Sequence, residues 1–223
     1  MESPKVPSAN TSSLSGNLIM AKKPHVADAA IAAALALAAE RGWRSLSLAD
    51  IAERAQLPLA DLAERFPSKA ALLDAYFRSV DSRMLAAGPE PGEVARDRLF
   101  EVLMRRFEAM APDRHALMVI LRESGDDPLT LFCGARRFLR SMALALEAAG
   151  LSSSGLGGMA RLEGLMGIYL YVLRAFLGDD TPDLTRTMAT LDKALRRAEG
   201  IASLLWTRRD VRPRAHTTVE GGV

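Results

Sequence analysis

The sequence predicts an all-helical protein. Alanine and leucine are abundant, whereas aromatic residues make up only 5% of the chain, and both alanine and leucine are strong helix formers. Apolar residues also recur three and four positions apart, as they do on one face of a helix. With 49% hydrophobic residues, the 223-residue chain can bury a substantial core. We expect a two-part fold of about nine helices from this periodicity.

The first predicted helix runs from near Val26 to Gly42. Residues 1–24 precede it and are rich in Ser, Pro and Asn, which predicts a disordered leader and basic arm. Either Met1 or Met20 can serve as the first residue. The apolar face of the helix is formed by Ile31, Ala34, Leu35 and Ala38.

Three shorter helices follow, and their ends carry capping signals. Ser47 is an N-cap with Asp50 three residues later, close to a capping box. A turn at 56–58 separates this helix from a short one that ends at Phe66, and Ser68 caps the next. Packing is the predicted role of the apolar positions Ile51, Ala52, Ala55, Leu62, Phe66, Leu72 and Leu73.

A Pro/Gly-rich segment at 88–93, GPEPGE, predicts a domain boundary. It separates a helical domain over 25–86 from a larger one over 93–206, and a polar tail covers 207–223. Residues 151–158 form a flexible connection. The helices expected in the larger domain cover 93–110, 113–124, 128–149, 159–177 and 184–206.

Composition also limits the compartment and the partners. The single cysteine, Cys133, excludes an internal disulfide framework and suits the cytoplasm. The most apolar run, 162–178, is interrupted by Glu163 and Arg174, so we expect no membrane span. A net charge of +2 provides no overall field that favours nucleic acid.

Nothing in the sequence indicates an enzyme. It contains no nucleotide-binding, hydrolase or zinc-protease motif. The three histidines, His25, His115 and His216, are far apart along the chain. We therefore expect no catalytic residues, no cofactor and no metal.

The stretch GWRSLSLADIAERAQLPLADLAERFPSKAALL, starting at Gly42, contains many residues at fixed spacings. It resembles the N-terminal domain of the TetR family of one-component repressors. The resemblance implies a helix-turn-helix that reads DNA, and a larger helical domain that binds a ligand and forms a homodimer. It is carried by Gly42, Ser47, Ile51-Ala52, the turn at 56–58, Phe66, Lys69 and Leu72-Leu73.

The helix that this resemblance places in the DNA groove is acidic. Asp61 and Glu64 outnumber Arg65, although carboxylates can read cytosine amino groups in the major groove. Each polar residue that could contact DNA has an alternative role, either as a helix cap or as a solvated surface charge. The candidate DNA-binding residues are Lys22, Lys23, Ser47, Arg54, Ala60, Asp61, Glu64, Arg65 and Lys69.

A second resemblance covers residues 164–202, which contain a tyrosine-bearing helix, an Asp-Thr-Pro-Asp loop and a Leu191-Asp192 pair with basic neighbours. This segment is similar to the C-terminal part of the coenzyme Q auxiliary lipid-binding family. That resemblance implies a TetR-like fold that binds isoprenoid lipids in support of ubiquinone biosynthesis and does not read DNA.

Methionines and aromatic residues on the helices of the larger domain suit a deformable ligand cavity. The alternative is a solid core or a dimer interface. The candidate ligand-binding residues are Met104, Phe107, Met118, Leu121, Phe138, Met142, Met166 and Tyr169. The homodimer is expected to use apolar stripes on the last two helices, formed by Leu165, Ile168, Val172, Leu195 and Leu204.

Two functions therefore follow from the sequence. The first is a dimeric TetR-type transcriptional regulator with a DNA operator and a small hydrophobic ligand. The alternative is a lipid-binding helper for an isoprenoid ligand. In that alternative, the apolar end of the last helix near Trp206 and the arginines after it predict peripheral contact with anionic membranes.

Overall fold

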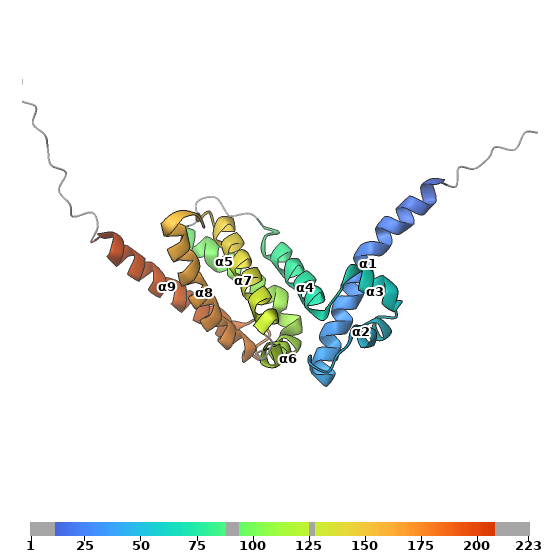
Figure 1. The fold of residues 1–223 in the computed structure, drawn as a ribbon. Helices are drawn as coiled ribbons and strands as arrows, with labels where there is room; N and C mark the ends of the chain where they lie inside the picture. The colour runs from blue at the N-terminus through green and yellow to red at the C-terminus, as the bar shows by residue number, and fades with distance from the viewer. Residues whose placement is uncertain (1–11, 88–93, 125–127, 208–223) are drawn as a thin grey trace, which may run out of the picture. The chain divides into compact units, whose positions relative to one another are not determined.

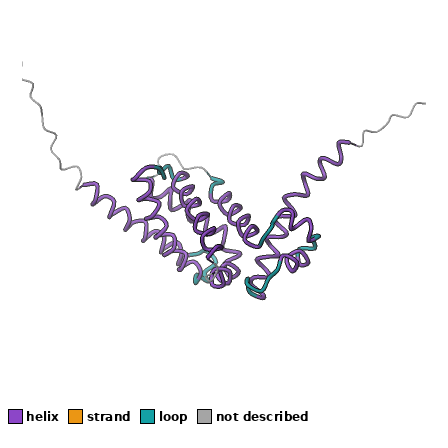
Figure 2. Tube along the Cα trace, viewed as in Figure 1, coloured by secondary structure: helices purple, strands orange, loops and turns teal. Residues whose placement is uncertain are grey.

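The computed structural model describes residues 12–87, 94–124 and 128–207, with side chains described for 26–87, 94–124 and 134–200. Every regular element in these ranges is helical (Figures 1 and 2), which confirms the predicted fold class. The elements are α1 (Ser12–Arg41), α2 (Leu48–Arg54), α3 (Leu59–Arg65), α4 (Lys69–Met84), α5 (Ala95–Met110), the short 3-10 helix η1 (Ala111–Asp113), α6 (Arg114–Glu123), α7 (Pro128–Ala148), α8 (Gly155–Leu177) and α9 (Thr185–Thr207).

Helix α1 begins much earlier than its apolar periodicity predicts. The sequence indicates a start near Val26, whereas the helix starts at Ser12, so 12–24 is not the expected disordered leader. The extension passes Pro24, which has no backbone N–H and therefore donates no hydrogen bond within the helix. Residues 1–11 lie outside the described residues, as do the boundary at 88–93 and the tail from 208 onward.

Helix α8 also begins before its expected start. Its first residue is Gly155, and the turn contains Gly158, whose backbone lies against that of Ser153. A Cβ at Gly158 would lie 2.3 Å from the carbonyl carbon of Ser153. The glycines at 155–158 thus permit a tight helix start where the sequence indicated a flexible connection.

The residues group into two compact units, described separately here. The first comprises 12–83 and 110–137 within the described ranges. Helix α6 belongs to it and packs along α1, although the sequence placed α6 in the larger domain. This arrangement covers the apolar face that α6 would otherwise expose. The core of this unit includes Leu37, Ile51, Leu62, Leu72, Val80 and Ile120.

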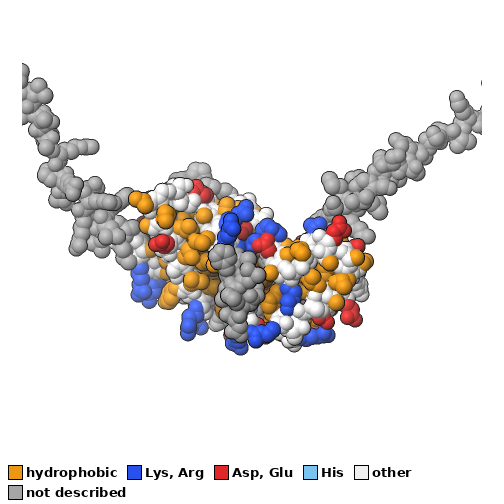
Figure 3. All heavy atoms as spheres, viewed as in Figure 1, with side chains coloured by type: hydrophobic (Ala, Val, Ile, Leu, Met, Phe, Trp, Pro, Cys, Tyr) orange, Lys and Arg blue, Asp and Glu red, His pale blue; other side chains and the backbone are white. Residues whose placement is uncertain are grey.

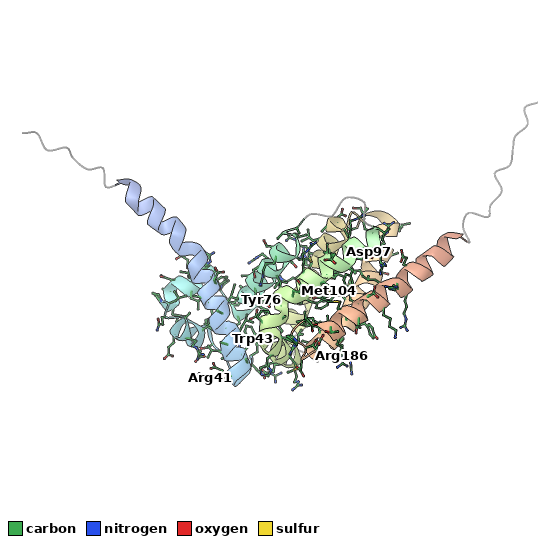
Figure 4. The ribbon with its side chains drawn as sticks, turned by 180° about the vertical axis from the view of Figure 1, so that it is seen from behind. Arg41, Trp43, Tyr76, Asp97, Met104 and Arg186 are labelled. Atoms are coloured by element: carbon green, nitrogen blue, oxygen red, sulfur yellow. The ribbon has the colours of Figure 1, made fainter. Side chains whose placement is uncertain are left out.

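A cavity of about 10 Å³ lies inside the first unit, between α1 and α4. Trp43 and Tyr76, both labelled in Figure 4, line it together with Ile31 and Leu72. This volume is about that of one water probe, and the lining is apolar, so the cavity is a small packing defect.

The second unit comprises 84–87, 94–109 and 138–207 within the described ranges. Helices α8 and α9 pack against each other as an antiparallel pair joined by a short loop. The core of this unit includes Leu103, Phe107, Met142, Leu165, Val172, Phe176, Leu191 and Leu195. No described helix in either unit combines the length and apolar character that a bilayer span requires.

Candidate functional site

Helices α2 and α3 form the predicted helix-turn-helix, and a capping box fixes its start. The backbone N–H of Ser47 donates to Asp50 Oδ2 at 2.8 Å, and the N–H of Asp50 donates to Ser47 Oγ at 3.1 Å. The Ser47 hydroxyl also donates to this carboxylate. Hydrogen bonds from the Ser47 side chain and backbone hold the pKa of Asp50 below its usual value. Ser47 is therefore occupied as a helix cap.

The turn between α2 and α3 reverses the chain at Gln56, which has a φ of 55°. The N–H of Leu57 donates to Ala52 O at 2.9 Å, which closes the end of α2. Helix α3 is held to the unit by Leu62, which has no exposed surface, and Phe66 is buried directly after the helix. These contacts confirm the packing roles expected for Leu62 and Phe66.

The rest of α3 faces solvent. Leu59 is 47% exposed, and Ala60, Asp61, Glu64 and Arg65 are also exposed. Within the described residues, neither Asp61 nor Glu64 has an ion pair. The Arg65 guanidinium lies 5.8 Å from the ring centre of its neighbour Phe66. The exposed face of α3 therefore presents two carboxylates, one guanidinium and apolar side chains.

Two of the basic residues expected at phosphates are engaged within the protein. Arg54 pairs with Glu40 of α1 at 2.6 Å. The ammonium of Lys69 donates to Trp43 O at 2.7 Å and lies 5.2 Å from the Trp43 ring centre. Burial lowers the pKa of Lys69, although the charges of nearby acids oppose this effect. Lys22 and Lys23 lie on α1, at positions whose side chains are outside the described set.

Sequence reasoning missed Glu123, the last residue of α6. Its carboxylate accepts a hydrogen bond from the backbone N–H of Arg44, 79 positions away, at 2.7 Å. The Arg44 side chain returns a hydrogen bond to Glu123 O at 3.1 Å. No pattern within the sequence links two residues so far apart, so only the fold could reveal this contact.

Comparison with known proteins identifies the helix-turn-helix. The model of the bacterial regulatory proteins of the tetR family matches residues 30–76, which include α2, the turn and α3. A TetR transcriptional regulator from Nitrosomonas europaea has a structure with a TM-score of 0.67 and 26% identity, and the match covers 78% of this chain and 98% of that one. The matches show a domain of the tetR family of bacterial regulatory proteins at residues 30–76 and a TetR-like fold over most of the chain.

Further comparisons agree with this assignment at the level of the fold. A TetR transcriptional regulator from Rhodococcus sp. RHA1 is 18% identical, with a TM-score of 0.58 over 79% of this chain and 96% of that one. No curated protein matches the sequence. The comparisons do not show the expected similarity to the coenzyme Q auxiliary family.

Two aspartates within residues 164–202 have structural partners in this chain. Asp179 is buried and accepts hydrogen bonds from the backbone and hydroxyl of Thr187, both at 2.7 Å, at the start of α9. Asp192 accepts a hydrogen bond from Arg96 at 2.8 Å and thereby links α9 to α5. Asp179 therefore caps the start of α9, and Asp192 holds α9 against α5.

Some of the candidate ligand residues come together in the second unit. Tyr169 of α8 stacks on Phe107 of α5, with 5.0 Å between ring centres, and lies 5.2 Å from the ring of Phe138 of α7. Met104 and Met142 are buried in the same unit, and Met166 is half-buried. These contacts build an aromatic cluster made of Phe107, Phe138, Tyr169 and the neighbouring Phe176.

Met118 and Leu121 lie in the first unit, on α6. Met118 is half-buried, but Leu121 is 47% exposed and departs from the expected enclosed apolar face. The buried side of α6 centres on Leu117 and Ile120. Leu121 follows Ile120 and so points about 100° further around the helix, toward solvent.

The aromatic cluster also contains a buried cation, whereas the sequence offered Arg106 as a head-group contact or a solvated charge. Arg106 is only 3% exposed, and its Nε donates to the Tyr169 hydroxyl at 3.0 Å. Its guanidinium lies 5.5 Å from the Tyr169 ring centre. Burial of a guanidinium is costly unless it is hydrogen-bonded, so this contact fixes the orientation of Tyr169 within the cluster.

Proposed function

We propose that this chain is a regulator that binds DNA sequence-specifically through α3, acts as a homodimer and responds to a small hydrophobic ligand held in its larger helical part. The observation that carries the proposal is the solvent-exposed α3, anchored by Leu62 inside the segment that matches the family. A DNA-binding regulator acts at the chromosome, so the proposal includes a cytoplasmic location.

The chemistry of α3 favours readout by hydrogen-bond acceptors and methyl contacts. Carboxylates such as Asp61 and Glu64 can accept hydrogen bonds from the exocyclic amino group of cytosine in the major groove. Leu59 and Ala60 can contact thymine methyl groups. Because Arg54 and Lys69 bind within the protein, we expect few phosphates to be neutralised. The slope of log affinity against log salt is about −0.9 for each neutralised phosphate, so the salt dependence should be shallow.

We expect selection from random duplexes to enrich cytosine-containing half-sites, and Glu64→Gln to change that preference. Glutamine donates and accepts hydrogen bonds and pairs well with adenine. The substitution should therefore cost about 1–3 kcal/mol at the cytosine and favour adenine there. Binding titrations on the selected duplex and its single-base variants measure this difference.

Glu53→Gln is the matched control, because Glu53 is an exposed acid on α2, outside the recognition helix. It should preserve the base preference. If the wild-type protein enriches no motif even at low salt, sequence-specific DNA binding by this chain is excluded.

The homodimer is proposed to use the outer face of α8. Leu165, Val172 and Leu195, expected at the interface, are instead buried within the protomer, because α8 and α9 pack on each other. Ile168 is half-buried, and the Leu204 side chain lies outside the described set. Figure 3 shows exposed hydrophobic side chains where Figure 1 places α8. The exposed large hydrophobic residues of α8 are Leu156, Met159, Leu170 and Tyr171, and open space adjoins Gly164 and Gly167.

We expect Tyr171→Glu to yield a monomer at micromolar concentrations at which the wild type sediments as a dimer. In a two-fold symmetric interface each substitution acts twice, and buried unpaired carboxylates are costly. Leu121→Glu is a suitable control, because Leu121 is a similarly exposed apolar residue on α6, in the other unit. A monomeric wild type, or a dimeric Tyr171→Glu protein, would contradict this interface.

A further inference from the structure

The loop between α1 and α2 is held from both sides at one peptide group. Glu123, at the end of α6, accepts the hydrogen bond from the backbone N–H of Arg44 at 2.7 Å. Lys69, at the start of α4, donates to Arg44 O at 3.3 Å and to Trp43 O at 2.7 Å. We call these contacts the Arg44 clamp, made of Trp43, Arg44, Lys69 and Glu123.

The shape of the loop is matched to the Glu123 carboxylate. Gly42 has a φ of 86°, a conformation that other residues rarely adopt, and a Cβ there would lie 2.7 Å from Glu123 Oε1. The carboxylate thus occupies space that only a glycine leaves open. Arg44 Nη2 also donates to Glu123 O at 3.1 Å, which gives α6 two hydrogen bonds to the same residue.

The Arg44 clamp lies directly before the recognition elements. Ser47, the N-cap of α2, follows Arg44 by three positions, and α2 packs against α3. A shift of the loop would therefore move α2 and, with it, the exposed face of α3. Lys69 and Arg44 lie within the residues that match the family model, whereas Glu123 comes from a helix outside them.

We propose that Glu123 is a positioning residue for DNA binding, which holds the α1–α2 loop so that α3 can enter the groove. This inference rests on the proposed function. Electrostatics alone gives the opposite expectation, because an acid near the DNA-binding helices repels phosphates and its removal strengthens binding. A positioning role therefore predicts that removal of the Glu123 carboxylate weakens DNA binding, whereas a purely electrostatic role predicts that it strengthens DNA binding.

The test compares Glu123→Ala with Glu123→Gln on the duplex selected by the wild-type protein, or on a fixed 30-base-pair duplex at low salt if none is selected. Alanine removes the acceptor for the Arg44 N–H, so affinity should fall about tenfold, the usual value of a hydrogen bond to a charged group. Glutamine keeps a side-chain oxygen and should retain affinity within about threefold. The salt slope should stay unchanged in both variants, because no phosphate contact is removed.

Glu108→Gln is the control for charge, since Glu108 is exposed on α5 in the other unit. Circular dichroism melts show whether each variant is folded at the assay temperature. If Glu123→Ala does not fold, Glu123→Asp takes its place, because the shorter side chain cannot reach the Arg44 N–H. Equal or stronger DNA binding by the folded alanine or aspartate variant overturns the inference. A wild-type protein that binds no DNA overturns the proposed function instead.

Discussion

Phe107→Ala should lower the free energy of unfolding by about 3–5 kcal/mol, the usual cost of removing a buried phenylalanine. Phe107 has no exposed surface and stacks on Tyr169 with ring centres 5.0 Å apart, and Phe176 lies 5.2 Å away. The loss combines the transfer of a large apolar side chain with the cavity left among rings that cannot close it. Thermal and urea unfolding of the two proteins measure the change.

This experiment also separates the two roles weighed for the candidate ligand residues. A side chain that lines an open ligand cavity contributes little to the stability of the ligand-free protein, whereas a core side chain contributes strongly. Phe138→Ala is the matched comparison, because Phe138 contacts the same Tyr169 ring but is only half-buried. We expect it to cost less than Phe107→Ala. A loss below about 1 kcal/mol for Phe107→Ala contradicts the core role.

Asp179→Ala should be the second strongly destabilising change, by about 2–4 kcal/mol, because it leaves buried donors without their acceptor. Asp179 is 1% exposed and accepts hydrogen bonds from Thr187 N and Oγ1, both at 2.7 Å, and from Thr181 N at 3.2 Å. Thr187 is fully buried, so its N–H cannot turn to water for a replacement. The substitution removes the link between the α8–α9 loop and the first turn of α9.

The same carboxylate should make stability depend on pH. Burial by itself raises the pKa of Asp179, but the hydrogen bonds from Thr181 and Thr187 outweigh it and lower the pKa from 3.8 to about 2. A lowered pKa in the folded state adds stability above the unfolded value, and that stability is lost as pH falls from about 4 to about 2.

Urea unfolding from pH 7 down to pH 2.5 measures this dependence in the wild type and in Asp179→Asn. Asparagine keeps one acceptor oxygen and does not titrate. The loss of unfolding free energy in acid should therefore be smaller for Asp179→Asn than for the wild type. Asp180→Asn is the control, because Asp180 is the exposed neighbour in the same loop. Parallel pH profiles for the wild type and Asp179→Asn would show that Asp179 does not cause the loss.

The fold class, most helix limits and the helix-turn-helix could be predicted from the amino-acid sequence. These features depend on contacts within about four positions, such as the Ser47–Asp50 capping box and the burial of Ile51 and Leu62 at helical spacing. The start of α1 was missed because helix growth toward Ser12 needs no apolar pattern. Local patterns could also place Phe107 and Tyr169 on apolar faces, but not in contact.

The partners of several polar and apolar side chains became known only from the packing of the helices. Lys69 was expected at a phosphate, yet it binds the carbonyls of the α1–α2 loop, because that loop folds back beside the start of α4. Val172 was expected at a dimer interface, yet it has no exposed surface within the protomer. Glu123 meets Arg44 across 79 positions. Such partners depend on how helices pack, and the same local sequence is compatible with many packings.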